Sequence, residues 1–113
     1  MKTETRKLSE EKWDPWIDEG YNAASSTMMV PKTEVKAVSC RIIRLEPDGH
    51  TGMHSHMRVH HVLALHGSPE LETDTERIKL DPLVAVKIAA NVPHRFINKG
   101  NNFALIQVQN LFP

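Results

Sequence analysis

The sequence has one cysteine, no net charge and no long apolar run, and each absence excludes a class of protein. Because Cys40 is alone, no disulfide can form within the chain. The 14 basic and 14 acidic residues cancel, and no basic stripe of the kind that binds a phosphate backbone is present. No apolar run approaches the roughly 20 residues that span a bilayer, and the charged first residues do not look like a secretion signal. We therefore expect a cytoplasmic protein that binds neither nucleic acid nor membrane.

Aromatic residues are also scarce, and three of the six, Trp13, Trp16 and Tyr21, lie near the start of the chain. The length of 113 residues and the hydrophobic content of 40% fit one compact domain, for which we assign residues 33–113. Residues 9–12 can form one helical turn that ends near Pro15. We expect residues 1–32 to be an N-terminal arm whose aromatic side chains cover the domain or a partner subunit.

Short apolar runs alternate with turn signals along the rest of the chain, which is typical of an all-β protein. The turn signals are residues 46–49, 67–69, 81–82 and 99–102. Eight short strands favour a single-domain jelly-roll β-barrel. The predicted strands are residues 34–45, 51–56, 60–66, 71–73, 77–80, 83–88, 94–98 and 103–109.

Four of the seven histidines have the spacing of ligands that neighbouring strands aim at one divalent metal ion. Side chains alternate along a strand, so His54 and His56 share a face. After three residues that can turn the chain, His60 can face back at this pair. His94 begins a later strand, 34 residues further on.

The other three histidines are expected to be solvated. His61 lies on the opposite face of its strand from His60, His66 is next to the Gly67 turn, and His50 is in the turn at residues 46–49. From His60 onward, alternation places Val62 and Ala64 on the inner face and leaves an apolar outer face as well, as in a two-sheet sandwich.

These residues resemble the cupin superfamily. The first cupin motif reads Gly, five residues, His-x-His, three or four residues, Glu, six residues, Gly. Gly49, His54, His56, His60 and Gly67 follow it, with one residue fewer after the first glycine and with histidine in place of the usual glutamate. The resemblance covers about residues 35–108 and implies a cupin-like jelly-roll barrel. Because small cupins commonly pair through such arms, we also expect a homodimer.

The second cupin motif reads Gly, five residues, Pro-x-Gly, two residues, His, three residues, Asn. It is matched at His94 and Asn98, whereas Leu83, Ala89 and Asn91 replace its small residues and its proline. Asn91 can stand in for glycine, because asparagine enters positive-φ turns more readily than most residues. The spacing of the motif is therefore kept, although several of its residues are replaced.

The predicted cofactor is one divalent metal ion per chain, with His54, His56, His60 and His94 as ligands. His60 could instead orient a water molecule. Four neutral imidazoles leave the charge of the ion uncompensated, so the site should favour anionic ligands. Octahedral coordination leaves two positions for a substrate, whereas tetrahedral coordination gives a closed site of the structural zinc type. Imidazole suits iron, nickel, copper and zinc, and the resemblance suggests manganese or iron as readily, so the metal stays open.

Three further residues are candidates for a substrate pocket. Phe96 lies two residues after His94, with core packing as the alternative role. Arg41, on an early strand, could bind a substrate carboxylate with two hydrogen bonds, or could simply be solvated. Gln107 could reach inward from the last strand. The acidic residues cluster in turns and in residues 70–76, so no catalytic side chain is assigned.

Three functions are compatible with this pattern. The first is a mononuclear metalloenzyme that acts on a small oxygen-rich substrate by a dioxygenase-like route or by isomerase or lyase chemistry. The second is a non-catalytic module that binds or senses a small molecule through the metal, and fold resemblance does not separate the two. The third is a purely structural metal that stabilises a small barrel.

Overall fold

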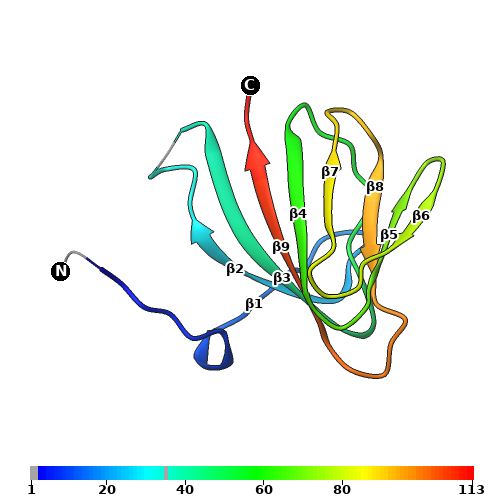
Figure 1. Ribbon diagram of the computed structural model, residues 1–113, viewed down its shortest axis with the longest axis horizontal. Coiled ribbons are helices and arrows are strands. Elements are labelled where there is room, and N and C mark those ends of the chain that lie inside the picture. The colour runs from blue at the N-terminus through cyan, green and yellow to red at the C-terminus, as the bar shows by residue number, and fades with distance from the viewer. Residues whose placement is uncertain (1–2, 35) are drawn as a thin grey trace.

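The computed structural model describes residues 3–34 and 36–113, whose regular secondary structure is β-strand apart from one short 3₁₀ helix. Within these residues, one antiparallel sheet curls into a half-barrel with the strand order β6-β5-β8-β3-β9-β4-β7, while β2 pairs with β3 and β1 with β2 (Figure 1). The predicted all-β fold is confirmed. No helix in the described part of the chain is long and apolar enough to cross a membrane. The elements are η1 Leu8–Glu10, β1 Asp14–Pro15, β2 Asn22–Val30, β3 Val38–His50, β4 Val59–His66, β5 Glu70–Thr73, β6 Arg77–Lys79, β7 Ala85–Ile88, β8 His94–Ile97 and β9 Ala104–Leu111.

The core lies inside the curl and follows the two-residue period of the strands. On β4, Val62 and Ala64 are buried on the same face as His60, as predicted. They pair with Val108 and Ile106 of β9, which are also buried. The face that carries the apolar core of both strands is thus also the face that carries His60. The buried core cluster is Ala24, Ile43, Leu45, Val62, Ala64, Leu71, Leu80, Ile88, Phe96, Ala104, Ile106 and Val108.

The first predicted turn, residues 46–49, is a bulge inside a longer strand. Strand β3 continues to His50, and its pairing with β2 shifts register between Leu45 and His50. Asp48 takes a positive φ of 66° there. A Cβ on Gly49 would lie 2.7 Å from the carbonyl oxygen of Ala23, so only glycine fits this position.

The predicted strand at residues 51–56 is wrong. These residues form a loop between β3 and β4 with a single β-bridge, between His54 and His94. The bridge has both of its backbone hydrogen bonds, with N···O distances of 3.0 and 2.9 Å. It ties the loop that carries the first two histidines to the start of β8.

The segment expected as an arm, residues 1–32, contributes a strand that was not predicted. Strand β2 pairs with β3 along most of its length. Ahead of β2, Trp16 and Tyr21 pack against the core cluster, and η1 lies close to the expected helical turn. The backbone of residues 3–7, ahead of η1, leads away from the sheet (Figure 1), while the Arg6 side chain donates to the carbonyl oxygen of Met28 on β2 at 2.9 Å.

Three positions of the second cupin motif have clear structural roles. Asn91 has a φ of 67°, which confirms that it occupies a position suited to glycine. Leu83 has a φ of 73°, a conformation that costs a non-glycine residue about 1–2 kcal/mol. The buried Asn98 side chain donates to the carbonyl oxygens of Leu45 and Asn102, at 3.0 and 2.9 Å, and so closes the turn after β8.

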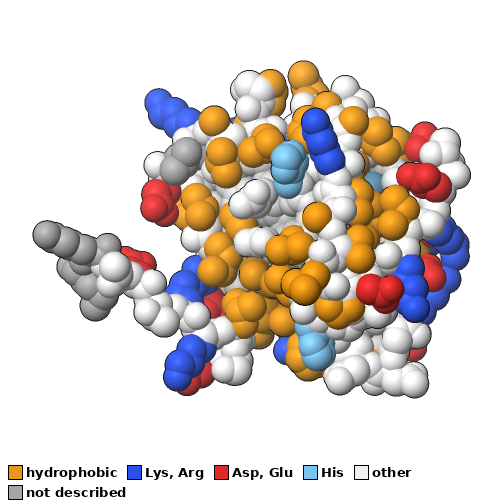
Figure 2. Space-filling model, viewed as in Figure 1, with side chains coloured by type: hydrophobic (Ala, Val, Ile, Leu, Met, Phe, Trp, Pro, Cys, Tyr) orange, Lys and Arg blue, Asp and Glu red, His pale blue; other side chains and the backbone are white. Residues whose placement is uncertain are grey.

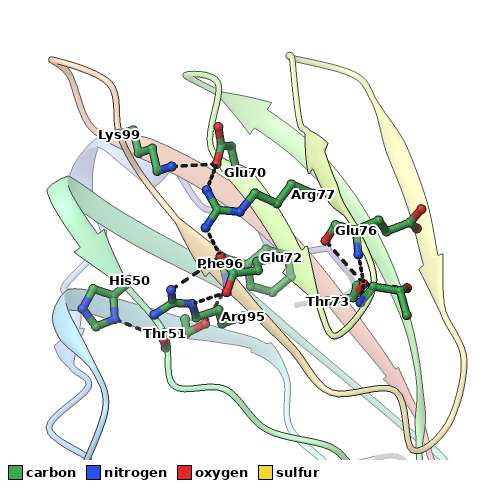
Figure 3. A network of polar contacts seen from close by, with 11 residues as sticks. His50, Thr51, Glu70, Glu72, Thr73, Glu76, Arg77, Arg95, Phe96 and Lys99 are labelled. Atoms are coloured by element: carbon green, nitrogen blue, oxygen red, sulfur yellow. Dashed lines mark hydrogen bonds and ion pairs between the residues drawn. The ribbon is translucent and has the colours of Figure 1, made fainter.

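A network of ion pairs covers the outer side of the β5–β6 hairpin and β8 (Figure 3). Glu72 lies 2.9 Å from the Arg77 guanidinium and 3.3 Å from that of Arg95. Glu70 lies 3.3 Å from Lys99 and 4.0 Å from Arg77. Charged side chains gather at this margin of the molecule, whereas hydrophobic side chains occupy the middle of the same view (Figure 2).

Candidate metal centre and its cavity

Three of the four predicted ligands converge. One ring nitrogen from each of His56, His60 and His94 lies within 4.8 Å of the others, a group that could hold a metal ion. His60 is on β4, His94 is the first residue of β8, and His56 is on the loop before β4. Strands β4 and β8 are not neighbours in the sheet, so it is the curl that brings their histidines together.

Hydrogen bonds orient two of these imidazole rings. The Nδ1–H of His60 donates to Asn110 Oδ1 at 2.6 Å, and the Nδ1–H of His94 donates to the carbonyl oxygen of Val92 at 2.9 Å. The Nε2 lone pair of each ring is then free to bind a ligand. His60 Nε2 is buried and has no hydrogen-bond partner. A metal-binding histidine commonly has this arrangement, with its other nitrogen held by a carbonyl or amide oxygen.

The protonation state of the group also suits a metal. Burial, followed by the charge of Arg58, lowers the pKa of His56 to about 4. Burial, followed by the charge of His94, lowers the pKa of His60 to about 4. Burial also lowers the pKa of His94. All three imidazoles are therefore neutral at pH 7, which is the form that coordinates metals, and the residues present fit a divalent ion.

The fourth predicted ligand, His54, lies beside this group and is not part of it. Its ring stacks at 5.8 Å from the ring of His56 and lies 5.5 Å from that of Tyr21. Its Nε2 atom is buried without a hydrogen-bond partner and lies next to the backbone of Gly52. The structure thus gives three converging histidines and one neighbour with a free ring nitrogen.

A cavity of about 420 Å³ opens beside the histidines. Its walls include the aromatic residues Trp16, Tyr21, Phe96 and Phe112. Phe96 lies 6.2 Å from His94, ring centre to ring centre, lines the cavity and is also part of the core cluster. Trp16 and Tyr21 belong to the segment before β2 and were not predicted to line the pocket.

Two arginines line the same cavity. The Arg41 guanidinium lies over the Trp16 ring at 4.6 Å, and the Nε–H of Arg58 donates to Asn110 Oδ1 at 3.3 Å. Burial lowers the pKa of both, and the charge of Arg41 lowers that of Arg58 further. In the described part of the chain, neither has a carboxylate within 4.0 Å. Arg41, a predicted pocket residue, thus lies in the cavity wall, and Arg58 is a second arginine of this wall that was not predicted.

The third predicted pocket residue, Gln107, is on the other face of the sheet. Its side chain lies 3.6 Å from Cys40 Sγ and does not line the cavity. The inward residue near this end of β9 is Asn110, which is buried and holds both His60 and Arg58. The alternation of the apolar residues Ala104, Ile106 and Val108 was the signal that could have found it.

By sequence, no family model and no curated protein matches the chain. By structure, it is similar to a polyketide cyclase from Streptomyces resistomycificus, with a TM-score of 0.84 and 17% identity over 98% of this chain and 80% of that one. A sugar phosphate isomerase of the cupin superfamily from Silicibacter pomeroyi has a TM-score of 0.81 and 17% identity, over 97% and 76%. The cupin domain of a transcriptional regulator of the XRE family from Enterobacter cloacae has a TM-score of 0.71 and 22% identity, over 81% and 99%. The chain therefore has the jelly-roll fold of the cupin superfamily.

Proposed function

We propose that the protein is a metal-dependent enzyme of the cupin type that acts on a small, oxygen-rich, anionic molecule. The observation that carries the proposal is the convergence of three neutral imidazoles, His56, His60 and His94, in the wall of a cavity large enough for a small substrate. Buried titratable side chains with shifted pKa values that cluster in a cavity are typical of functional sites.

Different residues would bind the metal, orient its ligands and contact the substrate. His56, His60 and His94 would hold one divalent ion, which when bound supplies a Lewis acid for substrate oxygens. Asn110 and the carbonyl of Val92 keep two of the rings in the coordinating tautomer. The pKa of Tyr21 is raised, chiefly by burial, so its hydroxyl stays protonated and can donate a hydrogen bond to a substrate oxygen.

The class of reaction is proposed from the neighbours and from the cavity. Two of the similar structures are a polyketide cyclase and a sugar phosphate isomerase, and they favour isomerase, lyase or cyclase chemistry over the dioxygenase-like route. The acidic residues of the cavity wall, Asp18 and Glu19, are exposed at its edge, away from the core. Proton transfer would therefore involve the histidines or Tyr21 rather than a buried carboxylate.

A second candidate is a non-catalytic module that senses a small molecule. It is supported by the similarity to the cupin domain of a transcriptional regulator. The same cavity and histidines would then bind the molecule without converting it. Turnover of a bound ligand by the metal-loaded protein separates the two, because a sensor returns its ligand unchanged.

The first experiment is metal analysis of the purified protein and of single histidine variants. We expect about one equivalent of metal per chain in the wild type and a large loss in His60→Ala and His94→Ala, because each removes one of three ligands. His61→Ala is the matched control, since His61 is the exposed neighbour of His60 on β4. A protein that binds no metal even after incubation with Mn, Fe, Ni, Cu or Zn salts contradicts the proposal.

The same assay decides the role of His54. Full metal content and unchanged metal affinity in His54→Ala would show that three histidines suffice. A loss as large as that of His56→Ala would make His54 a fourth ligand. If chelation unfolds the protein, the metal is structural; we expect the fold to persist, because the core cluster lies outside the histidine group.

A further inference from the structure

The distribution of arginine partners singles out the cavity. Four of the six arginines have a carboxylate within 4.0 Å: Arg6, Arg44, Arg77 and Arg95. The remaining two, Arg41 and Arg58, are half-buried, and both line the cavity. Partly buried guanidinium groups without a carboxylate are costly unless something else compensates their charge. An anion that enters the cavity would provide that compensation for both.

The distribution of aromatic residues singles out the same place. Four of the six aromatic side chains of the chain line this cavity. Trp16 and Tyr21 are stacked, with ring centres 4.7 Å apart and an angle of 24° between their planes, and the Arg41 guanidinium lies over the Trp16 ring at 4.6 Å. Phe96 contributes to the wall that carries His94. A cavity lined by aromatic side chains favours planar molecules, because aromatic rings pair well edge to face or offset-stacked.

We propose that this cavity selects planar aromatic or conjugated acids, with the acidic group on Arg41 and Arg58 and the flat body among the aromatic side chains that line the cavity. The acidic group is a carboxylate or an equivalent oxygen anion, because a guanidinium donates two parallel hydrogen bonds to such a group. This proposal specifies the substrate class of the proposed function. It rests on the proposed function only for the contact between a substrate oxygen and the metal. Acid binding itself depends on the two arginines.

One contact links acid recognition to the histidines. Asn110 Oδ1 accepts hydrogen bonds from both Arg58 Nε and His60 Nδ1, and Asn110 Nδ2 donates to Ser39 Oγ at 3.0 Å. Arg58 and His60 therefore share one fixed acceptor. An acid held by Arg58 would lie next to His60, where an oxygen substituent near the acidic group could reach the metal.

The test compares three probes of one shape by calorimetry. The probes are 2-naphthoate, the neutral 2-naphthalenemethanol and the saturated decahydro-2-naphthoate, each titrated into the protein as purified and after chelation. We expect 2-naphthoate to bind at least roughly 10-fold more tightly than either analogue, because one lacks the charge and the other lacks the planar ring. Equal affinity for 2-naphthoate and the alcohol would overturn the acid site, and equal affinity for the two acids would overturn the selection of planar molecules.

Single substitutions test which side chains bind the acid. Arg41→Gln and Arg58→Gln should weaken 2-naphthoate binding roughly 10- to 100-fold, the range of one lost charge-assisted hydrogen bond, and leave the alcohol unaffected. Arg44→Gln is the matched control, because Arg44 is on the same strand but pairs with Glu46. Wild-type affinity in both cavity variants would overturn the assignment. Trp16→Leu should reduce the preference for the planar acid.

The metal content of the same samples separates this proposal from the proposed function. Arg41→Gln should keep its metal and lose the acid. If the wild-type protein takes up no metal but still prefers 2-naphthoate, the proposed function fails and the acid site stands. If it takes up metal and shows no preference among the probes, the acid site fails and the metal centre stands.

Discussion

Strand β8 separates two polar clusters of opposite character. On its outer face, Arg95 joins the ion-pair network in which Glu70 and Glu72 each contact two basic groups (Figure 3). On its inner face, His94 joins a group of imidazoles that includes a buried nitrogen without any partner. The outer cluster pairs its charges with one another, whereas the inner cluster leaves imidazole nitrogens without a partner.

For the proposed metal site, this difference marks where stability would be lost in favour of binding. Polar groups that are desolvated without a partner destabilise the folded protein, and burial accordingly lowers the pKa of His56 and His60. A fold selected for stability alone would fill the cavity with apolar side chains or pair its arginines, as it does on the outer face. The predictions below perturb one cluster and leave the other intact.

The largest effect should come from pH. Because the pKa of His56 and His60 is about 4 in the folded protein and near 6.5 when unfolded, the unfolded chain binds more protons between these values. The metal-free protein should therefore lose stability as the pH falls from 6.5 to 4, by about 3 kcal/mol from His60 alone. Urea denaturation at several pH values measures this loss. A flat profile, or an unchanged slope in His60→Gln, would contradict the buried neutral imidazoles.

A smaller effect is expected when the support of the metal site is removed. Asn110→Ala deletes the acceptor shared by His60 and Arg58 and should weaken metal binding roughly 10- to 100-fold while His60 itself remains. Calorimetric titration with zinc measures the change. The control is Gln107→Ala, on the opposite face of β9, which should bind zinc like the wild type. Equal affinities in the two variants would remove Asn110 from the site.

The smallest effect should come from removing one carboxylate of the outer ion-pair cluster. Glu72→Gln leaves Arg77 and Arg95 without their closest carboxylate and should lower the free energy of unfolding by about 1 kcal/mol, the range for partly exposed ion pairs. Metal content and 2-naphthoate binding should not change. A loss of metal in this variant would show that the two faces of β8 are coupled, against the separation described above.

The regular part of the fold was predictable because it follows a two-residue period. The alternation from His60 through Ala64 gave the inner face of β4 correctly. Strand β2 was missed because its sequence, rich in alanine, serine and threonine, has no apolar alternation and gains its stability from pairing with β3. The bulge at Asp48 was read as a turn because the same residues suit both. The homodimer and the cytoplasmic location stay predictions.

The site was predictable as far as its spacing matched a known motif. His56, His60 and His94 came together as expected, although the loop that carries His56 is not a strand. Arg58 was missed because it lies in the short connection before β4, where periodicity says nothing about direction. Asn110 was missed because the last strand was ended one residue too early and the wrong face was chosen for Gln107.

The position of β9 also determines when the histidine group can form during folding. Strand β3 pairs with β9 across the sheet, with Val38 opposite Leu111, so the two partners are separated by most of the chain. Such distant pairings form slowly, because a long loop must close before its contacts stabilise it. His60 acquires its Asn110 acceptor only when β4 has paired with β9, a pairing that joins residues 50 positions apart. The ordered imidazole group is therefore a late product of folding, and the appearance of high-affinity metal binding in a refolding experiment would report completion of the sheet.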